Sequence, residues 1–204
     1  MSFYDRYGKR AFDVVAASGA LVVLSPLLLA LAVAIALALG QPVLFRQQRT
    51  GQGRRAFHIV KFRSMLDAVD ADGHALPDEV RLTRFGRFLR STSLDELPGL
   101  FNILRGEMSI VGPRPFVHVY DPLYSPEQAR RFLVRPGITG WAQINGRNAI
   151  SWPQKFALDV WYVDHRSFAL DLRIIAATIA KVFARHGINS EEATTMLPFR
   201  GETD

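Results

Sequence analysis

The stretch VVAASGALVVLSPLLLALAVAIALALGQPVLF, residues 14–45, decides the fold, because none of its 32 residues carries a charge. A segment of about 20 apolar residues is enough to cross a bilayer, so this one is long enough to enter it. A buried helix of a soluble core is seldom so uniformly apolar. The apolar part of a secretory signal has only about 7–15 residues. The sequence therefore predicts a membrane helix that is retained rather than cleaved.

Ser25 and Pro26 lie near the middle of this segment and predict a bend. Proline donates no backbone hydrogen bond, and its ring clashes with the carbonyl four residues earlier, here that of Val22. The Ser25 hydroxyl is placed to satisfy backbone groups that the bend releases. At about 1.5 Å per residue, each arm would be about 20 Å long, which is shorter than the ~30 Å hydrocarbon core.

The charges beside the segment favour a hairpin that enters and leaves on one side over a kinked single span. Basic residues prefer the cytoplasmic side of a membrane, and both flanks are basic. The basic residues are Arg6, Lys9 and Arg10 before the segment, and Arg46, Arg49, Arg54, Arg55, Lys61 and Arg63 after it.

The remaining sequence predicts an α+β fold that is mainly helical, with interfacial amphipathic helices and a small β-hairpin. The hairpin joins Val43–Gln47 to Phe57–Phe62 across a turn-rich stretch at 50–55. Pro77-Asp78 opens a helix, Arg81–Leu104 forms one helix, and Leu170–Ala184 forms another that Gly187 ends. In the helix predicted at Arg81–Leu104, arginine recurs at every third position of the first ten residues (Arg81, Arg84, Arg87 and Arg90). This pattern indicates either a solvated face or a site for anionic headgroups.

Composition narrows the chemistry. The net charge is +6, from 25 basic residues against 19 acidic ones, and 21 of the basic residues are arginines. Arginine binds phosphate bidentately, so nucleic acid, an anionic membrane and a phosphorylated small molecule are all candidate partners. The absence of cysteine excludes thiolate metal sites and cysteine nucleophiles, and the five histidines have no metal-ligand spacing. Any catalysis is therefore expected to depend on carboxylates, arginines and a hard cation with oxygen ligands.

The adjacent carboxylates Asp95 and Glu96, in SLDELP at 93–98, are the first candidate site. Neighbours on a helix point about 100° apart, so one can face a reacting atom while the other binds a metal ion. A charged helix end with a capping role is the alternative.

Three basic segments could hold phosphate. Arg114 lies between the prolines of GPRP, 112–115, which suits either a phosphate clamp or a structural turn. Lys61 and Arg63 are expected on one face of a strand. The loop at 135–148, which contains Arg147, is typical of nucleotide pockets and equally of ordinary turns.

Together these segments resemble the bacterial sugar transferase family, the monotopic polyprenyl-phosphate phosphoglycosyl transferases. They occur in the family's order over most of residues 6–165. The matching segments are Lys9-Arg10 with Asp13, Ser25-Pro26, FRQQRTG at 45–51, Phe57 with KFRSM at 61–65, SLDELP at 93–98, GEMSIVGPRP at 106–115 and RPGITGWAQINGR at 135–147.

The resemblance implies transfer of a sugar 1-phosphate from a UDP-sugar to polyprenyl (undecaprenyl) phosphate, with release of UMP, at the start of a surface-glycan or glycoconjugate pathway. It implies that Asp95 is a nucleophile that forms a covalent aspartyl phospho-sugar and that Glu96 is a Mg²⁺ ligand. It also implies that Lys61, Arg63, Arg114 and Arg147 bind substrate, and that nucleic acid is not a partner.

The resemblance also gives the expected organisation. Residues 1–41 are expected to form a re-entrant membrane hairpin, 42–188 a catalytic domain, and 189–204 a C-terminal tail. The location would be the cytoplasmic face of the bacterial inner membrane. Two alternatives remain: a membrane-anchored module that binds nucleic acid or a protein partner, and a glycosyltransferase that moves sugar without phosphate and releases UDP. The sequence leaves the sugar and the oligomeric state open.

Overall fold

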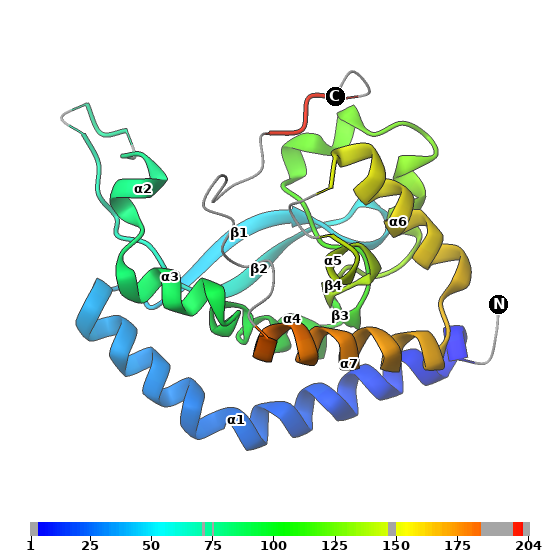
Figure 1. The fold of residues 1–204 in the computed structure, drawn as a ribbon, viewed down its shortest axis with the longest axis horizontal. Coiled ribbons are helices and arrows are strands. Elements are labelled where there is room, and N and C mark those ends of the chain that lie inside the picture. Colours follow the sequence, from blue (N-terminus) through cyan, green and yellow to red (C-terminus); the bar gives the residue numbers. More distant parts are fainter. Residues whose placement is uncertain (1–3, 71, 75, 147–149, 185–197, 202–204) are drawn as a thin grey trace.

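The structure is a computed structural model that describes residues 4–70, 72–74, 76–146, 150–184 and 198–201. Its longest element is α1 (Lys9–Leu39), which follows a turn of π-helix at Tyr4–Gly8. The helix bends midway, and its concave side faces the rest of the chain (Figure 1). Beside Pro26, the Ser25 hydroxyl donates a 2.8 Å hydrogen bond to the Val22 carbonyl. The expected bend is therefore present, within one continuous helix.

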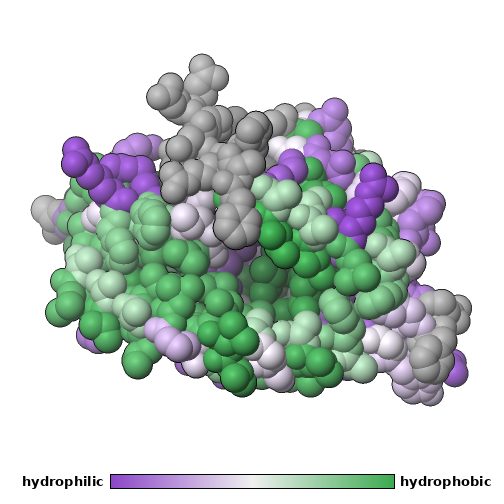
Figure 2. Space-filling view, turned by 60° about the horizontal axis from the view of Figure 1, so that its bottom comes forward, coloured by the Kyte–Doolittle hydropathy of each residue, from purple (hydrophilic) through white to green (hydrophobic). Residues whose placement is uncertain are grey.

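The surface of α1 is apolar and largely uncovered. Tyr4–Leu39 is long and apolar enough to cross a membrane, and only 11% of its most apolar 18-residue window is buried. A core helix of a soluble protein would be mostly buried. Figure 2 shows a broad hydrophobic surface on this side of the molecule. Large apolar side chains are exposed on α1 and also on α3 (Arg84–Ser91), α4 (Gly99–Arg105) and α7 (Phe168–Ala184). They are Val15, Val22, Val23, Leu29, Leu37, Phe88, Phe101, Phe168, Leu172 and Ile179.

Both ends of α1 are tied to the folded body. Near its start, the buried Asp13 carboxylate accepts 3.0 Å hydrogen bonds from the Ser109 hydroxyl and the Ile110 amide. Lys9 pairs with the buried Asp171 at 2.7 Å. At its end, the Arg63 guanidinium donates to the Leu39 carbonyl.

The predicted hairpin is confirmed. Strands β1 (Leu44–Thr50) and β2 (Ala56–Phe62) pair antiparallel, from Leu44 opposite Phe62 to Thr50 opposite Ala56, and a short 3₁₀ turn (Gln52–Arg54) joins them. β2 is covered by the first half of α1 and by α4 (Gly99–Arg105). Alternate β2 residues fill the core between these elements (Phe57 and Ile59 against Ala17, Leu100, Ile103 and Met108).

The helix predicted to open at Pro77-Asp78 is present as the short α2 (Asp78–Arg81). The prediction of one helix over Arg81–Leu104 is wrong, because beyond α2 the segment is divided into three pieces. These are α3 (Arg84–Ser91), the 3₁₀ turn η3 (Leu94–Glu96) and α4. The Thr83 side chain caps α3 by accepting from the Gly86 amide at 3.0 Å. Ser93 takes a left-handed conformation, with φ of 57°, which ends α3 and redirects the chain into η3.

The arginines of this segment are divided between the surface and packing contacts. Arg84 and Arg87 are exposed, as a solvated face predicts, whereas Arg81 and Arg90 are partly buried. The Arg81 and Arg87 side chains donate to the backbone carbonyls of Leu66 and Leu82, and Arg90 donates to the Ser64 hydroxyl. Binding of anionic headgroups by these arginines stays a prediction.

The second layer contains a parallel pair of short strands, β3 (Ser109–Val111) and β4 (Gly137–Thr139). Around it lie 3₁₀ segments η4 (His118–Leu123) and η5 (Gln128–Leu133), and helices α5 (Trp141–Ile144), α6 (Trp152–His165) and α7 (Phe168–Ala184). The buried Tyr162 hydroxyl donates to Asp171 at 2.7 Å and to the Val111 carbonyl at 3.2 Å, which fixes α6 and α7 against β3. The predicted helix at 170–184 is thus present, while Gly187 lies outside the described residues.

Candidate active site

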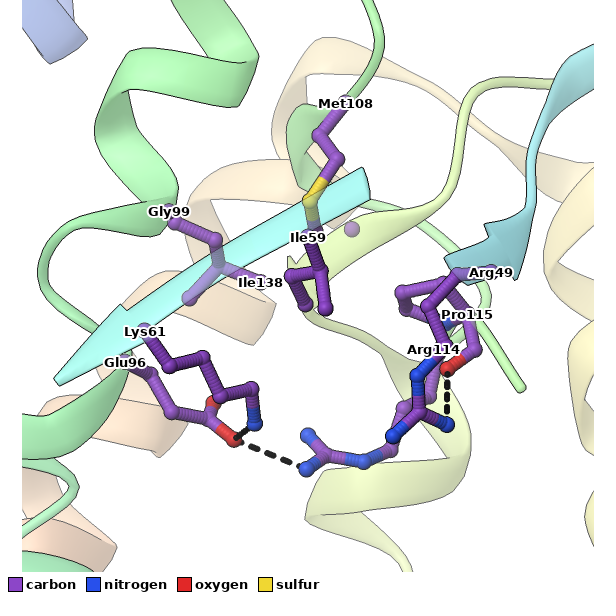
Figure 3. A pocket seen from close by; sticks show the side chains of 10 residues that line it. Arg49, Ile59, Lys61, Glu96, Gly99, Met108, Arg114, Pro115 and Ile138 are labelled. Carbon is purple, nitrogen blue, oxygen red and sulfur yellow. Dashed lines mark hydrogen bonds and ion pairs between the residues drawn. The ribbon is translucent and has the colours of Figure 1, made fainter. Parts of the chain in front are cut away.

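Glu96 is the centre of the polar cluster. It ends η3, and its Oε1 atom accepts hydrogen bonds from Lys61 Nζ and from Arg114 Nη2, each at 2.7 Å (Figure 3). The two donors come from β2 and from the segment after β3. The structure therefore brings together three residues that are 18 and 35 positions apart in the chain.

The two cations decide the charge of Glu96. Burial by itself would raise the pKa of its carboxyl, but Arg114 and Lys61 together outweigh burial and hold that pKa well below its usual range. Burial also lowers the pKa of Lys61, an effect that Glu96 opposes. Glu96 is therefore an anion at any physiological pH.

Asp95 has a different environment. Its side chain is buried, and among the described residues no hydrogen bond or ion pair to its carboxylate is found. Burial, followed by the negative charge of Glu96, raises the pKa of Asp95 to about 6, although Lys61, Arg90 and Arg114 pull it down. At pH 7 this carboxylate is therefore mostly ionised. Asp95 is thus an anion with no fixed partner, which suits a nucleophile.

A small pocket that is open to solvent lies beside this cluster. In Figure 3, Lys61 and Arg114 point toward Glu96 from two sides of it, and Arg49 lies next to Arg114. The lining residues are Arg49, Ile59, Lys61, Glu96, Gly99, Met108, Arg114, Pro115, Gly137 and Ile138. Three of them are cations against one carboxylate, so the pocket has an excess of positive charge that suits a diphosphate.

The backbone around Arg114 is held at four successive carbonyls, from Pro113 to Phe116. The Pro113 carbonyl accepts from the Gly137 amide at 2.9 Å, and the Arg114 carbonyl from Arg131 Nη2 at 2.6 Å. The next two carbonyls accept from β1: that of Pro115 from the Arg49 side chain at 3.3 Å, and that of Phe116 from the Thr50 amide at 3.2 Å. Gly112 permits the approach of the neighbouring strand, because a Cβ there would lie 2.4 Å from the Arg135 carbonyl oxygen. The segment is rigid, as its two prolines indicate.

The remaining candidate residues lie elsewhere. Arg63 directly follows β2, and its side chain does not join Lys61 at Glu96. Its buried guanidinium instead donates to the Leu39 and Gln41 carbonyls at the end of α1 and pairs with Asp67 at 2.9 Å. Arg147 lies outside the described residues. Ser25 and Pro26 are at the bend of α1.

Two arginines of this site were not singled out as binding residues. Arg49 belongs to the segment FRQQRTG, which only indicated family resemblance. Arg131 lies in η5, and nothing in the local sequence distinguishes it from its exposed neighbour Arg130. Their roles come from contacts with Pro115 and Arg114, which no local pattern shows.

The carboxylates fit the magnesium ion that the family resemblance implies. Both cations donate to Oε1 of Glu96, and within the described residues no donor to Oε2 or to the Asp95 carboxylate is found. Carboxylate oxygens are suitable ligands for Mg²⁺, which usually binds one or two of them and completes its shell with water and substrate phosphates. Glu96, with Asp95 beside it, supplies that number.

Comparison with known proteins gives consistent matches. A family model described as bacterial sugar transferase matches residues 4–185. The chain is 52% identical to the uncharacterized sugar transferase EpsL of Bacillus subtilis (strain 168), with 96% of this chain and 97% of that protein covered. It is 42% identical to the exopolysaccharide production protein PSS of Rhizobium leguminosarum bv. phaseoli, with 87% and 96% covered. It is 41% identical to an undecaprenyl-phosphate glucose phosphotransferase of Komagataeibacter xylinus, with 91% of this chain but only 38% of that protein covered.

Proposed function

Because the chain belongs to the bacterial sugar transferase family, we propose that it transfers a sugar 1-phosphate from a UDP-sugar to undecaprenyl phosphate and releases UMP. The observation that carries this proposal is the convergence of Lys61 and Arg114 on Glu96, directly beside Asp95, whose carboxylate has no hydrogen-bond partner among the residues that the structure describes. The names of the relatives support undecaprenyl phosphate as acceptor and exopolysaccharide synthesis as the pathway.

The reaction proceeds by two displacements at the phosphorus atom that carries the sugar. In the first, an Asp95 carboxylate oxygen bonds to that phosphorus, the bond to the bridging oxygen breaks, and UMP leaves with the electron pair. In the second, a phosphate oxygen of the lipid bonds to the same phosphorus and releases the Asp95 carboxylate. The charges of the two anionic substrates then need never share the site.

The cations of the pocket stabilise the negative charge of the diphosphate during these displacements. Lys61 and Arg114 are already aimed at an anion, so a diphosphate meets donors that need little rearrangement. The high pKa of Asp95 reflects its burial, and it leaves the carboxylate ionised yet poorly solvated at pH 7, as a nucleophile requires. Neither displacement needs a proton at Asp95.

Glu96 would hold Mg²⁺, with Asp95 adjacent. When bound, the ion would neutralise charge on the diphosphate and on the departing UMP. The contacts of Glu96 would meanwhile keep Lys61 and Arg114 in place.

The chain acts at the membrane through α1 in this proposal. A re-entrant α1 at the cytoplasmic face brings a lipid acceptor and a soluble nucleotide-sugar to one surface. The support is the bent, exposed, apolar helix and the basic flanks on both of its sides.

The test is nucleotide release from a panel of UDP-sugars by detergent-solubilised protein at stoichiometric concentration, without lipid. We expect a burst of UMP and a phospho-sugar adduct on Asp95, and ping-pong kinetics once undecaprenyl phosphate is added. Asp95→Asn should lose the adduct and nearly all turnover yet still bind UDP-sugar, whereas Asp164→Asn, at an exposed acid, should behave as wild type. Release of UDP would establish sugar transfer without phosphate. Dependence of UMP release on the lipid would refute the covalent step.

A further inference from the structure

Arg131 is a fully buried cation behind the Arg114 segment. Only 2% of its side chain is exposed, and the same holds for Asp159 of α6, its ion-pair partner at 2.8 Å. The guanidinium carbon lies 4.5 Å from the centre of the Phe116 ring and 5.4–5.6 Å from the rings of Tyr124, Phe132 and Phe156. A buried charge is costly unless it is well paired, so this placement calls for a reason.

The reason is a further contact of Arg131, with the main chain of Arg114. The same nitrogen that pairs with Asp159, Nη2, also donates to the Arg114 carbonyl at 2.6 Å. Because Pro113 and Pro115 have no amide hydrogen, the carbonyls are the main backbone groups through which hydrogen bonds can fix this segment. Arg131 donates to the carbonyl of Arg114, the residue whose side chain reaches Glu96.

The aromatic residues around Arg131 join separate parts of the chain. Phe116 follows the Arg114 segment, Phe132 belongs to η5, and Phe156 belongs to α6. Phe199, from the C-terminal residues 198–201, is 3% exposed and packs on Phe156 at 5.0 Å and on Tyr124 at 5.5 Å between ring centres. These residues leave the guanidinium little freedom, so they fix the point from which it holds Arg114.

We propose that Arg131 is a positioning residue for the reaction: anchored by Asp159 and the aromatic rings, it sets the main chain of Arg114 so that the Arg114 guanidinium reaches Glu96 and the donor diphosphate. The catalytic part of this inference rests on the proposed function. A plain structural ion pair between η5 and α6 is the competing account, and it requires no coupling between Arg131 and Arg114.

The variants separate these accounts. Arg131→Lys keeps the charge opposite Asp159 but loses the planar guanidinium, in which Nη2 serves Asp159 and the Arg114 carbonyl while Nη1 donates to the Tyr124 hydroxyl at 3.2 Å. The double variant Arg131→Met with Asp159→Leu removes both buried charges, which proteins tolerate better than the loss of one partner. Arg130→Gln is the matched control, since Arg130 is the neighbouring residue and forms exposed ion pairs with Glu127 and Asp164.

The activity test is a double-mutant cycle with Arg114→Ala, followed with radiolabelled UDP-sugar so that small rates are measurable. In the wild-type background, Arg131→Lys should lower kcat/KM for UDP-sugar by about 10- to 100-fold, as expected for a misplaced catalytic group. In the Arg114→Ala background the same change should cost less than about twofold, because its target is gone. Equal losses in the two backgrounds would overturn the proposal.

Hydrogen exchange gives a readout that needs neither substrate nor activity. Exchange in the peptide covering 109–117 should rise in both Arg131 variants, while exchange in β2 should stay as in the wild type and in Arg130→Gln. Unchanged exchange at 109–117 would refute the positioning role even if activity fell. If the wild type released no UMP from any UDP-sugar, the proposed function would fail, but the exchange result would still decide whether Arg131 positions Arg114.

Discussion

Arg63 provides the sharpest test of the structure against the resemblance, because the two give it different tasks. As a phosphate contact it would be exposed to substrate. In the structure it is 6% exposed and donates to the Leu39 and Gln41 carbonyls at the end of α1. The perturbation is Arg63→Met, which keeps the stem of the side chain and removes the donors.

The expected loss follows from these contacts. A hydrogen bond from a charged group contributes about 1.5–3 kcal/mol. Gln41 is exposed, so water can replace one donor, and the net loss in unfolding free energy should be about 3 kcal/mol. For a chain of this size that corresponds to a drop of about 6–12 °C in Tm. The ion pair with Asp67, whose side chain is 66% exposed, should add less than about 1 kcal/mol.

The assay pairs thermal unfolding in detergent with steady-state kinetics at a temperature below both transitions. Arg63→Met should lower Tm by the stated amount and leave KM for UDP-sugar within about twofold of wild type. Asp67→Asn, the matched control, removes only the exposed pair and should shift Tm by no more than about 4 °C. An unchanged Tm together with a large rise in KM would refute the structural role and restore the phosphate contact.

Three further predictions follow from the site and from α1. Activity requires ionised Asp95, and burial raises the pKa of this carboxyl to about 6, so kcat/KM should rise with pH to a plateau above about pH 7. The midpoint of the rise should lie at or below about pH 6, because a bound cation can only lower this pKa, and a midpoint above pH 7 would contradict the prediction. Glu96→Gln should lose about 100-fold or more in turnover while Glu127→Gln, at an exposed acid, should not, and full activity in excess EDTA would exclude the metal. Because the chain has no cysteine, Ser2→Cys and Gln48→Cys can be labelled singly, and neither should react with a membrane-impermeant reagent in intact cells; labelling of Ser2→Cys there would rule out the re-entrant topology.

Local signals in the sequence predicted local structure well. The β1–β2 hairpin, the bend at Pro26 and the helix at 168–184 each depend on neighbouring residues: β-prone runs around a turn, a proline with a serine, and an amphipathic repeat. The division of 81–104 was missed although Thr83 and Pro98 are both helix-boundary residues. The decisive break lies at Ser93, and its left-handed backbone is not a serine preference but a demand of the tertiary fold.

Residue chemistry marked Asp95 with Glu96, Lys61 and Arg114 as separate candidates, and only the resemblance joined them into one site. Spacing alone does not bring Lys61, Glu96 and Arg114 together, because their contacts close loops of 18 and 35 residues. For the same reason the strand alternation that paired Lys61 with Arg63 misled: it considers the strand alone, whereas the end of α1 offers the Arg63 side chain the Leu39 and Gln41 carbonyls as partners. Arg131 carried no local signal at all.

The contacts at the two ends of α1 bear on how a membrane can hold this chain. A straight helix of 31 residues would be about 46 Å long, enough to carry its ends to opposite faces of a bilayer. Here Asp13 bonds the first part of α1 to β3, and Arg63, the residue after β2, bonds to the last residue of α1. Both strands belong to the same folded body. The bend projects away from that body (Figure 1). A bilayer that takes up the apolar middle can therefore leave both ends on one side with every anchor intact, whereas a single span would break the bonds of Asp13 or those of Arg63. Straightening the helix with Pro26→Ala should strain these anchors and move part of the population toward a spanning state.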